Sequence, residues 1–275
     1  MTWMNDIKVV VFDLDGTLYQ DYRFLGRYVQ HLLKGTLSEQ EIEEQVKTAY
    51  AILEGNHAVR LGYFYNRENG HAYAHDNFIP TTAYSFESLL IPEETGAISD
   101  DELFFFLGDP WCIAQMLADK YEVPISKRNE AFEAVRFEML QQPYEIYGHA
   151  PLFDSIADLP IEKKVLMTNT PGVTGPAFVE YLNIGSLFDA YLFDAKKPTG
   201  MQSIVKGFLD EGYKPHEILS IGDNPFNDLA PVQQLGGRTC LISPYVHYGA
   251  NDWDHCVKTV EDLARFLSRQ SALKI

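Results

Sequence analysis

An uninterrupted apolar run, Val9-Val10-Val11-Phe12, ends directly at the acidic turn Asp13-Leu14-Asp15-Gly16. Four similar runs occur late in the chain, at residues 164–167, 190–193, 218–221 and 239–242. Continuous β-branched and aromatic runs of this length are typical of strands buried on both faces of a parallel sheet. Helix-length segments alternate with the late runs, at residues 173–183, 200–211, 227–235 and 260–268. This alternation predicts a doubly wound, Rossmann-like α/β sheet.

Residues 21–144 separate the first run from the later ones and have a different character, with helical periodicity and many aromatic residues. We therefore expect two domains. The α/β core comprises residues 1–20 and 145–275, and residues 21–144 form an inserted, mainly helical domain.

Local signals place three helices in the insertion. Ser38-x-x-Glu41 has the spacing of a capping box and predicts a helix that begins there. Asp109 is a helix N-cap candidate, and Pro110 suits the first turn of a helix that continues to Lys120. A third helix is expected over residues 126–140. The region from 56 to 95 mixes Gly, Asn, His and Pro with aromatic residues, and we expect it to be rich in loops.

Two carboxylates, Asp13 and Asp15, follow the first strand at a spacing that lets both approach one ligand. Gly16 permits the tight backbone turn that this arrangement needs. Crowded carboxylates repel one another, which favours a bound cation and separates their proton affinities. One carboxylate can then attack a substrate while the other transfers a proton. Taken alone, however, the motif is better explained as an ordinary Asp-Gly turn at a strand end.

Further polar residues follow the later strands, and the whole set resembles the four motifs of the haloacid dehalogenase-like (HAD) superfamily. Asp13 to Thr17 match the DxDGT motif, and Thr168 with Asn169 matches the second motif. Lys196-Lys197-Pro198 offers two lysines for the third, of which Lys197 matches better. Gly222 to Asp228 match the acidic fourth motif. The resemblance covers about residues 7 to 20 and 145 to 245 and implies an HAD core with a helical cap inserted between the first two motifs.

The resemblance implies a role for each residue. Asp13 is the nucleophile that becomes phosphorylated, and Asp15 protonates the leaving oxygen and later activates water. Thr168, Asn169 and Lys197 contact the phosphoryl group, and the Lys197 ammonium neutralises its charge. Supporting roles fall to Thr17 and Asp228, where Asp228 assists either the metal or Lys197.

A metal site follows from the same residues. Asp13, the backbone carbonyl of Asp15 and Asp223 offer only oxygen ligands, which suit a hard cation that keeps several waters. Mg²⁺ is therefore the expected cofactor.

These motifs favour a phosphatase that hydrolyses a small phosphate monoester, such as a nucleotide or sugar phosphate. Asp15 is present, whereas the dehalogenases of the superfamily lack this residue. A phosphoryl-transferring mutase is the nearest alternative, and a catalytically silent sensor or binding protein is a further one. The motifs handle only the phosphoryl group, so they leave the substrate open.

Composition limits the partners. The formal net charge is −17, with 22 Lys and Arg against 39 Asp and Glu, which disfavours nucleic acid and anionic membranes as partners. The three cysteines, Cys112, Cys240 and Cys256, have no metal-site or disulfide spacing. No apolar segment is long enough for a membrane span. We expect a cytoplasmic protein that acts on a small molecule.

Two other groups of residues suggest sites. His57, His71, His75 and Asp76 would suit a second metal site or a substrate contact, with His71 and His75 on one face if the segment is helical, but ordinary packing explains them better. Tyr19 faintly resembles a feature of nucleotidase-like members. The aromatic residues Tyr65, Tyr73, Phe78 and Tyr84 would either stack a base or fill a core.

Overall fold

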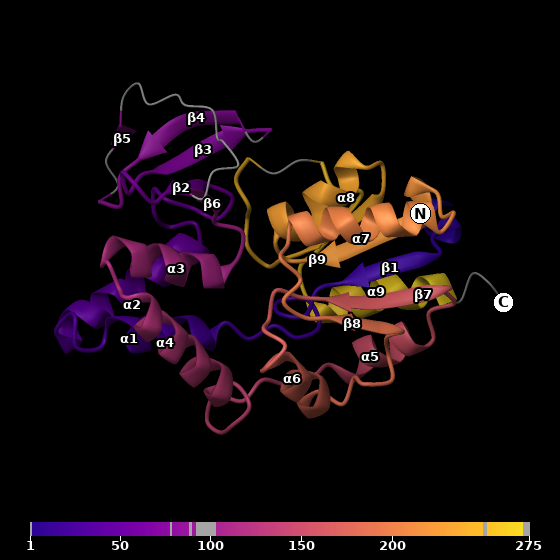
Figure 1. The fold of residues 1–275 in the computed structure, drawn as a ribbon, viewed down its shortest axis with the longest axis horizontal. Coiled ribbons are helices and arrows are strands. Elements are labelled where there is room, and N and C mark those ends of the chain that lie inside the picture. The colour runs from indigo at the N-terminus through magenta and orange to yellow at the C-terminus, as the bar shows by residue number, and fades with distance from the viewer. Residues whose placement is uncertain (1, 78, 88–89, 92–102, 250–251, 272–275) are drawn as a thin grey trace. The chain divides into compact units, whose positions relative to one another are not determined.

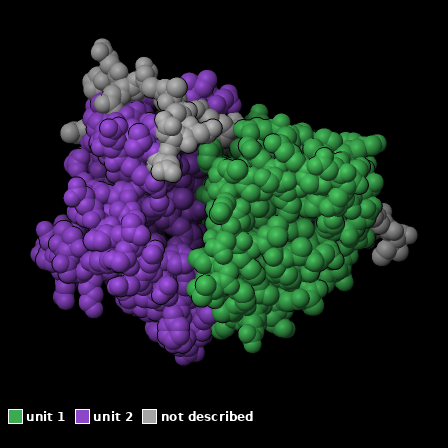
Figure 2. All heavy atoms as spheres, viewed as in Figure 1, with its two compact units in different colours: residues 1–21, 146–244, 252–275 green, residues 22–145, 245–251 purple. Residues whose placement is uncertain are grey.

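The computed structural model describes residues 2–77, 79–87, 90–91, 103–249 and 252–271. The chain divides into two compact units, coloured separately in Figure 2. The core unit comprises residues 1–21, 146–244 and 252–275, and the inserted unit comprises residues 22–145 and 245–251. The division expected from the sequence placed residues 245–251 in the core.

The core unit is built on a six-stranded sheet in the order β11-β10-β9-β1-β7-β8, and all of its pairings are parallel (Figure 1). Its strands are β1 (Val9–Phe12), β7 (Lys163–Met167), β8 (Ala190–Leu192), β9 (Ile218–Gly222), β10 (Arg238–Ile242) and β11 (His255–Val257). Every residue of β1 is fully buried, as its continuous apolar run predicts. The predicted parallel α/β fold is confirmed. Only β11, a short strand with a polar start, was missed.

Helices cover this sheet. They are α5 (Ala150–Ala157), α6 (Gly175–Tyr181), α7 (Thr199–Asp210), α8 (Ala230–Gln234) and α9 (Val260–Ser271), with short helical turns at Thr2–Asp6, Pro215–Glu217 and Pro225–Leu229. On one face, Val9 and Val11 pack with Val165 and Met167 against α7 and α8. Helices α5 and α9 pack on one another. The expected helices at 173–183, 200–211, 227–235 and 260–268 are present, whereas α5 was not predicted.

Four helices form one part of the inserted unit: α1 (Arg23–Leu33), α2 (Glu39–Leu53), α3 (Pro110–Lys120) and α4 (Ile125–Glu138). Helix α1 packs against the other three. The capping box at Ser38 and Glu41 is confirmed, and the Asp109 side chain accepts a hydrogen bond from Cys112 N–H, as expected of an N-cap.

A five-stranded antiparallel sheet, in the order β5-β4-β3-β2-β6, forms the other part of the inserted unit (Figure 1). Its strands are β2 (Phe64–Asn66), β3 (Ala72–Asp76), β4 (Ile79–Tyr84), β5 (Leu90–Ile91) and β6 (Phe104–Phe106). The expectation of a loop-rich region over 56–95 was therefore wrong where the structure describes it, and residues 78, 88–89 and 92–95 lie outside the described residues. The expected helices of the insertion are present, and the described residues add this antiparallel sheet to them.

Short strands explain this error. The β2–β3 turn is closed by Asn66, whose side-chain oxygen accepts a hydrogen bond from Glu68 N–H at 2.8 Å, and by Gly70 at φ +71°. The paired strands bring aromatic rings together. The ring centroids of Phe64 and Phe106 lie 5.1 Å apart, and those of Tyr73 and Phe104 lie 5.8 Å apart. Strands of two to six residues give too few periods to distinguish a strand from a polar loop.

Residues 245–249 belong to the inserted unit and contact it through their backbone. Tyr248 N–H donates a hydrogen bond to the Leu61 carbonyl oxygen at 2.9 Å. Gly62, at φ +92°, leaves room for this approach, because a Cβ atom there would lie 2.2 Å from the Tyr248 carbonyl oxygen. Among the described residues, no helix combines the length and hydropathy needed to cross a bilayer.

Candidate active site

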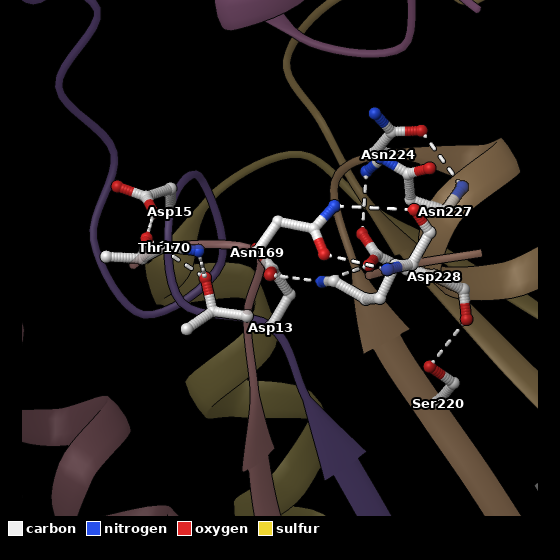
Figure 3. A network of polar contacts seen from close by, with 10 residues as sticks. Asp13, Asp15, Asn169, Thr170, Ser220, Asn224, Asn227 and Asp228 are labelled. Carbon is white, nitrogen blue, oxygen red and sulfur yellow. Dashed lines mark hydrogen bonds and ion pairs between the residues drawn. The ribbon is translucent and has the colours of Figure 1, made fainter. Parts of the chain in front are cut away.

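The residues predicted to form the site lie in four loops that leave the carboxyl ends of strands in the core sheet (Figure 3). Asp13 follows β1, Thr168 follows β7, Lys197 lies between β8 and α7, and Asp223 follows β9. Strand-like hydrogen bonds continue into these loops. Asp13 N–H donates to the Ile221 carbonyl at 2.9 Å. Parallel strands end at a common edge, which is why residues far apart in sequence meet here.

Lys197 forms two buried ion pairs, one with Asp13 after β1 and one with Asp228 after β9. Its Nζ atom lies 2.5 Å from Asp13 Oδ1 and 2.6 Å from Asp228 Oδ1, and its side chain is only 3% exposed. Burial alone would lower the pKa of Lys197, but the two carboxylates outweigh it and raise the pKa above the ordinary value. The ammonium group therefore stays charged within the site.

The backbone of Lys197 is fixed by Asn169. The Asn169 side-chain oxygen accepts a hydrogen bond from Lys197 N–H at 2.8 Å, and its amide nitrogen lies 3.5 Å from the Lys197 carbonyl oxygen. The Asn169 side chain thus positions the lysine loop. The predicted contact between Asn169 and substrate stays a prediction and concerns its backbone N–H group.

Asp228 is held from three sides. Oδ1 pairs with Lys197, Oδ2 accepts a hydrogen bond from Asn224 N–H at 3.0 Å, and the backbone carbonyl accepts one from Ser220 Oγ at 2.8 Å (Figure 3). The carboxylate is 1% exposed. Asn224 was not singled out in the sequence, yet its place one residue after Asp223 in the acidic turn is the signal that marks it.

Three carboxylates converge at this edge. Asp13, Asp223 and Asp228 each place one oxygen within 4.8 Å of the others. Gly16, at φ +73°, is required beside them, because a Cβ atom there would lie 2.1 Å from Asp223 Oδ2. Lys197 supplies one positive charge to this set of three acidic side chains. An all-oxygen set with this charge fits a hard divalent cation.

Burial raises the pKa of Asp13 to about 8, and the neighbouring Asp228 and Asp15 carboxylates act in the same direction, while Lys197 opposes them. Asp13 therefore holds a proton more readily than an exposed aspartate does. A cation bound to the cluster would favour the ionised carboxylate that a nucleophile requires.

The cluster of three carboxylates does not include Asp15, whose side chain accepts hydrogen bonds from two hydroxyl groups. Tyr19 OH donates to Oδ1, and Thr170 Oγ1 donates to Oδ2 at 2.9 Å. Thr168 Oγ1 donates a hydrogen bond to Thr170 Oγ1 at 3.1 Å, so the Thr168 hydroxyl proton points at another group of the protein.

Thr17 is fully buried, and its hydroxyl has no hydrogen-bond partner among the residues that the structure describes. Thr170 was missed in the sequence, where only its position two residues after Thr168 marks it.

The histidines of the insertion do not form the suggested metal site. His75 lies within β3 and His71 just before it, so the helical geometry assumed for them is wrong. His75 packs 5.2 Å from the Phe64 ring, and His57 Nδ1 accepts a hydrogen bond from Val59 N–H at 3.0 Å. Within the described parts of the chain, Asp13, Asp223 and Asp228 are the only potential metal-binding cluster.

The aromatic residues singled out in the insertion pack within its sheet. Tyr65 and Tyr73 are buried, and Tyr63 stacks on Tyr84 at 5.8 Å. Phe78 lies outside the described residues. Tyr19 belongs to the core unit, where it stacks against Phe178 of α6.

The family model for haloacid dehalogenase-like hydrolases matches residues 7–236. The chain belongs to this family. The match spans β1, the insertion and the four loops that carry the HAD motifs, so the resemblance drawn from the motifs is confirmed. No curated protein matches the chain at a significant level.

Solved structures share the fold of this HAD protein. One neighbour is the proposed HAD hydrolase YfnB of Bacillus subtilis, solved with magnesium bound, and another is a proposed phosphatase from Clostridium difficile. Each is 14% identical with a TM-score of 0.53, and the alignment covers 95% of this chain and 98% of the other. At this identity the likeness concerns the fold alone.

Proposed function

We propose that this HAD hydrolase is a magnesium-dependent phosphatase that hydrolyses a small phosphate monoester through an aspartyl phosphate on Asp13. The observation that carries the proposal is the placement of Lys197, whose ammonium group bridges Asp13 and Asp228 beside a third carboxylate, Asp223. This combination provides a nucleophile, a fixed positive charge and a set of metal ligands within a few ångströms.

A substrate dianion must be attracted locally, because the formal net charge of the protein is −17. Lys197 supplies one positive charge. Asp13, Asp223 and the backbone carbonyl of Asp15 would hold Mg²⁺, with Asp228 beside them. When bound, Mg²⁺ neutralises phosphoryl oxygens and lowers the repulsion between the substrate and Asp13.

In the first step, a carboxylate oxygen of Asp13 attacks phosphorus while the bond from phosphorus to the ester oxygen breaks. Asp15 donates its proton to the departing oxygen, which leaves as an alcohol. Lys197 and the N–H groups that follow Thr168 stabilise the charge on the phosphoryl oxygens.

In the second step, Asp15 accepts a proton from water as that water attacks phosphorus. The bond between phosphorus and the Asp13 oxygen breaks, inorganic phosphate is released and Asp15 again carries its proton. Each turnover therefore consumes one water and leaves both carboxyl groups as they began.

Substrate selection is assigned to the inserted unit, since the residues of the core site address only the phosphoryl group. YfnB, one of the structural neighbours, is described as undergoing interdomain movement, which is consistent with closure of such a unit. A closing unit favours a small phosphorylated metabolite.

The proposal is tested by phosphate release from p-nitrophenyl phosphate and a panel of small phosphate esters, with Mg²⁺ and with a chelator. Asp13→Asn is compared with Asp6→Asn, which removes an exposed carboxylate before β1. We expect Mg²⁺-dependent release in the wild type and in Asp6→Asn, and loss of release in Asp13→Asn. Release that persists in the folded Asp13→Asn variant would contradict the proposal. A folded wild type that only transfers phosphoryl groups between sugars would instead identify a mutase.

A further inference from the structure

Both oxygens of the Asp15 carboxylate accept a hydrogen bond from a hydroxyl group, and the two hydroxyl groups come from separate segments of the core unit. Tyr19 OH donates to Oδ1 from the same loop, four residues further on. Thr170 Oγ1 donates to Oδ2 at 2.9 Å from the loop after β7. Two donors on opposite oxygens oppose rotation of the carboxylate plane, which one donor alone would allow.

The Tyr19 side chain is itself held firmly in place. It is 1% exposed, and its ring stacks on Phe178 of α6 with centroids 6.4 Å apart and planes 30° apart. An isolated backbone bridge joins Asp15 and Tyr19. A hydroxyl on a buried, stacked ring has little freedom to move away from its acceptor.

The second donor is fixed by a directed chain of hydrogen bonds. Thr170 N–H donates to Thr168 Oγ1 at 3.1 Å, and Thr168 Oγ1 donates to Thr170 Oγ1 at 3.1 Å. The only proton of the Thr170 hydroxyl is then directed at Asp15. Each Asp15 oxygen keeps a second lone pair, so both donors can stay in place while the carboxyl group exchanges a proton.

We propose that Tyr19 and Thr170 are positioning residues that hold Asp15 in the orientation needed for proton transfer to the leaving oxygen and from water. This inference rests on the proposed function, since it assigns a purpose to the Asp15 environment within that reaction. Neither residue touches the phosphoryl group in this account. They act only through Asp15.

The inference predicts a dependence on the leaving group. A departing p-nitrophenolate is stable as an anion and needs little help from a proton donor, whereas phenolate and methoxyphenolate need more. A misaligned Asp15 therefore slows the poor leaving groups most. A defect that merely loosens the fold slows all substrates of similar shape to the same degree.

The test uses p-nitrophenyl, phenyl and p-methoxyphenyl phosphate at saturating Mg²⁺, with kcat/KM measured for the wild type, Tyr19→Phe and Thr170→Val. The Tyr19→Phe change keeps the stacked ring and removes only the hydroxyl. Tyr191→Phe is the matched control, because Tyr191 OH donates instead to the Ile184 carbonyl at 2.7 Å, away from Asp15. Thr170→Ser keeps the second donor.

We expect Tyr19→Phe and Thr170→Val each to lower kcat/KM about tenfold more for the methoxyphenyl ester than for the nitrophenyl ester, because each loses one hydrogen bond to a carboxyl group that becomes charged as its proton leaves. Tyr191→Phe and Thr170→Ser retain the wild-type ratio. Equal losses on all three esters, or no losses, would overturn the inference.

Crystal structures of the variants test this inference independently of the proposed function. If the wild type releases no phosphate in an Asp13-dependent way, the proposed function fails, and the orientation of Asp15 still decides the positioning claim. We expect the Asp15 carboxylate to rotate in Tyr19→Phe and to keep its orientation in Tyr191→Phe. An unchanged carboxylate in Tyr19→Phe would overturn the claim.

Discussion

Different forces stabilise the carboxyl edge of the core sheet and the antiparallel sheet of the inserted unit. At the core edge, charged side chains are fixed by directed contacts such as the two ion pairs of Lys197. In the inserted sheet, uncharged aromatic rings such as Phe64 and Phe106 pack edge to face. Substitutions at the core edge should therefore disturb chemistry, whereas those in the inserted sheet should disturb stability.

The largest difference is expected for Lys197→Met. Removal of the ammonium group leaves Asp13 and Asp228 facing each other without a cation, and we expect kcat to fall about 1,000-fold. Steady-state kinetics with p-nitrophenyl phosphate measure this loss. The control is Lys196→Met, which removes the adjacent, exposed lysine and should leave kcat within a few-fold of the wild type.

The same variant should also lose stability in a pH-dependent way. The free energy of unfolding is expected to fall by about 3 kcal/mol at pH 8, since breaking a buried ion pair leaves uncompensated charge. The loss should shrink as the pH is lowered, because the raised pKa of Asp13 lets this carboxyl take up a proton. A loss that grows toward acid pH would contradict this account.

A pH-dependent effect of similar size is expected within the inserted unit, at His247. Burial lowers the pKa of this side chain to about 4. The unfolded chain binds the proton near pH 6.5, so stability is fully present above that value and is lost as the pH falls toward 4, by about 1.4 kcal/mol per pH unit. Urea denaturation between pH 4.5 and 7 measures this slope.

The contribution of His247 is isolated by comparing two variants. His247→Gln cannot titrate and should flatten the slope by one proton, whereas His216→Gln alters an exposed histidine and should leave the slope unchanged. An unchanged slope in His247→Gln would assign the acid sensitivity to other groups.

The smallest effect is expected for Phe64→Leu in the inserted sheet. Phe64 is 2% exposed and contacts Phe106 and His75 through its ring edge. Loss of the ring contacts should lower the free energy of unfolding by about 1–2 kcal/mol. At the same time kcat for p-nitrophenyl phosphate should change less than threefold, roughly a 0.6 kcal/mol effect. A large loss of kcat without a loss of stability would remove the contrast between the two regions.

Sequence reasoning succeeded where one local pattern carries the structure. The Val9–Phe12 run predicts a buried parallel strand, and the strand ends then predict which residues meet. The Ser38 capping box and the Asp109 cap depend on a few neighbouring residues and were also predicted correctly.

Features that depend on distant partners were not predicted. The pairing of β2 with β6 joins segments that are separated in the chain by β3, β4 and β5, and each strand is too short for its periodicity to reveal the pairing. Thr170 is an ordinary threonine until the fold places its hydroxyl 2.9 Å from Asp15. The hydrogen bond from the Tyr19 hydroxyl to Asp15 could likewise not be predicted, because it depends on the turn that brings the two side chains together.

The most direct test of the proposed mechanism is to trap the phosphorylated enzyme. The wild type is mixed with p-nitrophenyl phosphate and Mg²⁺, quenched rapidly in acid and digested, and the peptide that contains Asp13 is examined by tandem mass spectrometry. We predict the added mass of one phosphoryl group on Asp13, its absence with chelator, and its absence in Asp13→Asn. Phosphate release without any phosphorylated Asp13, or a phosphoryl group on a different residue, would contradict the account.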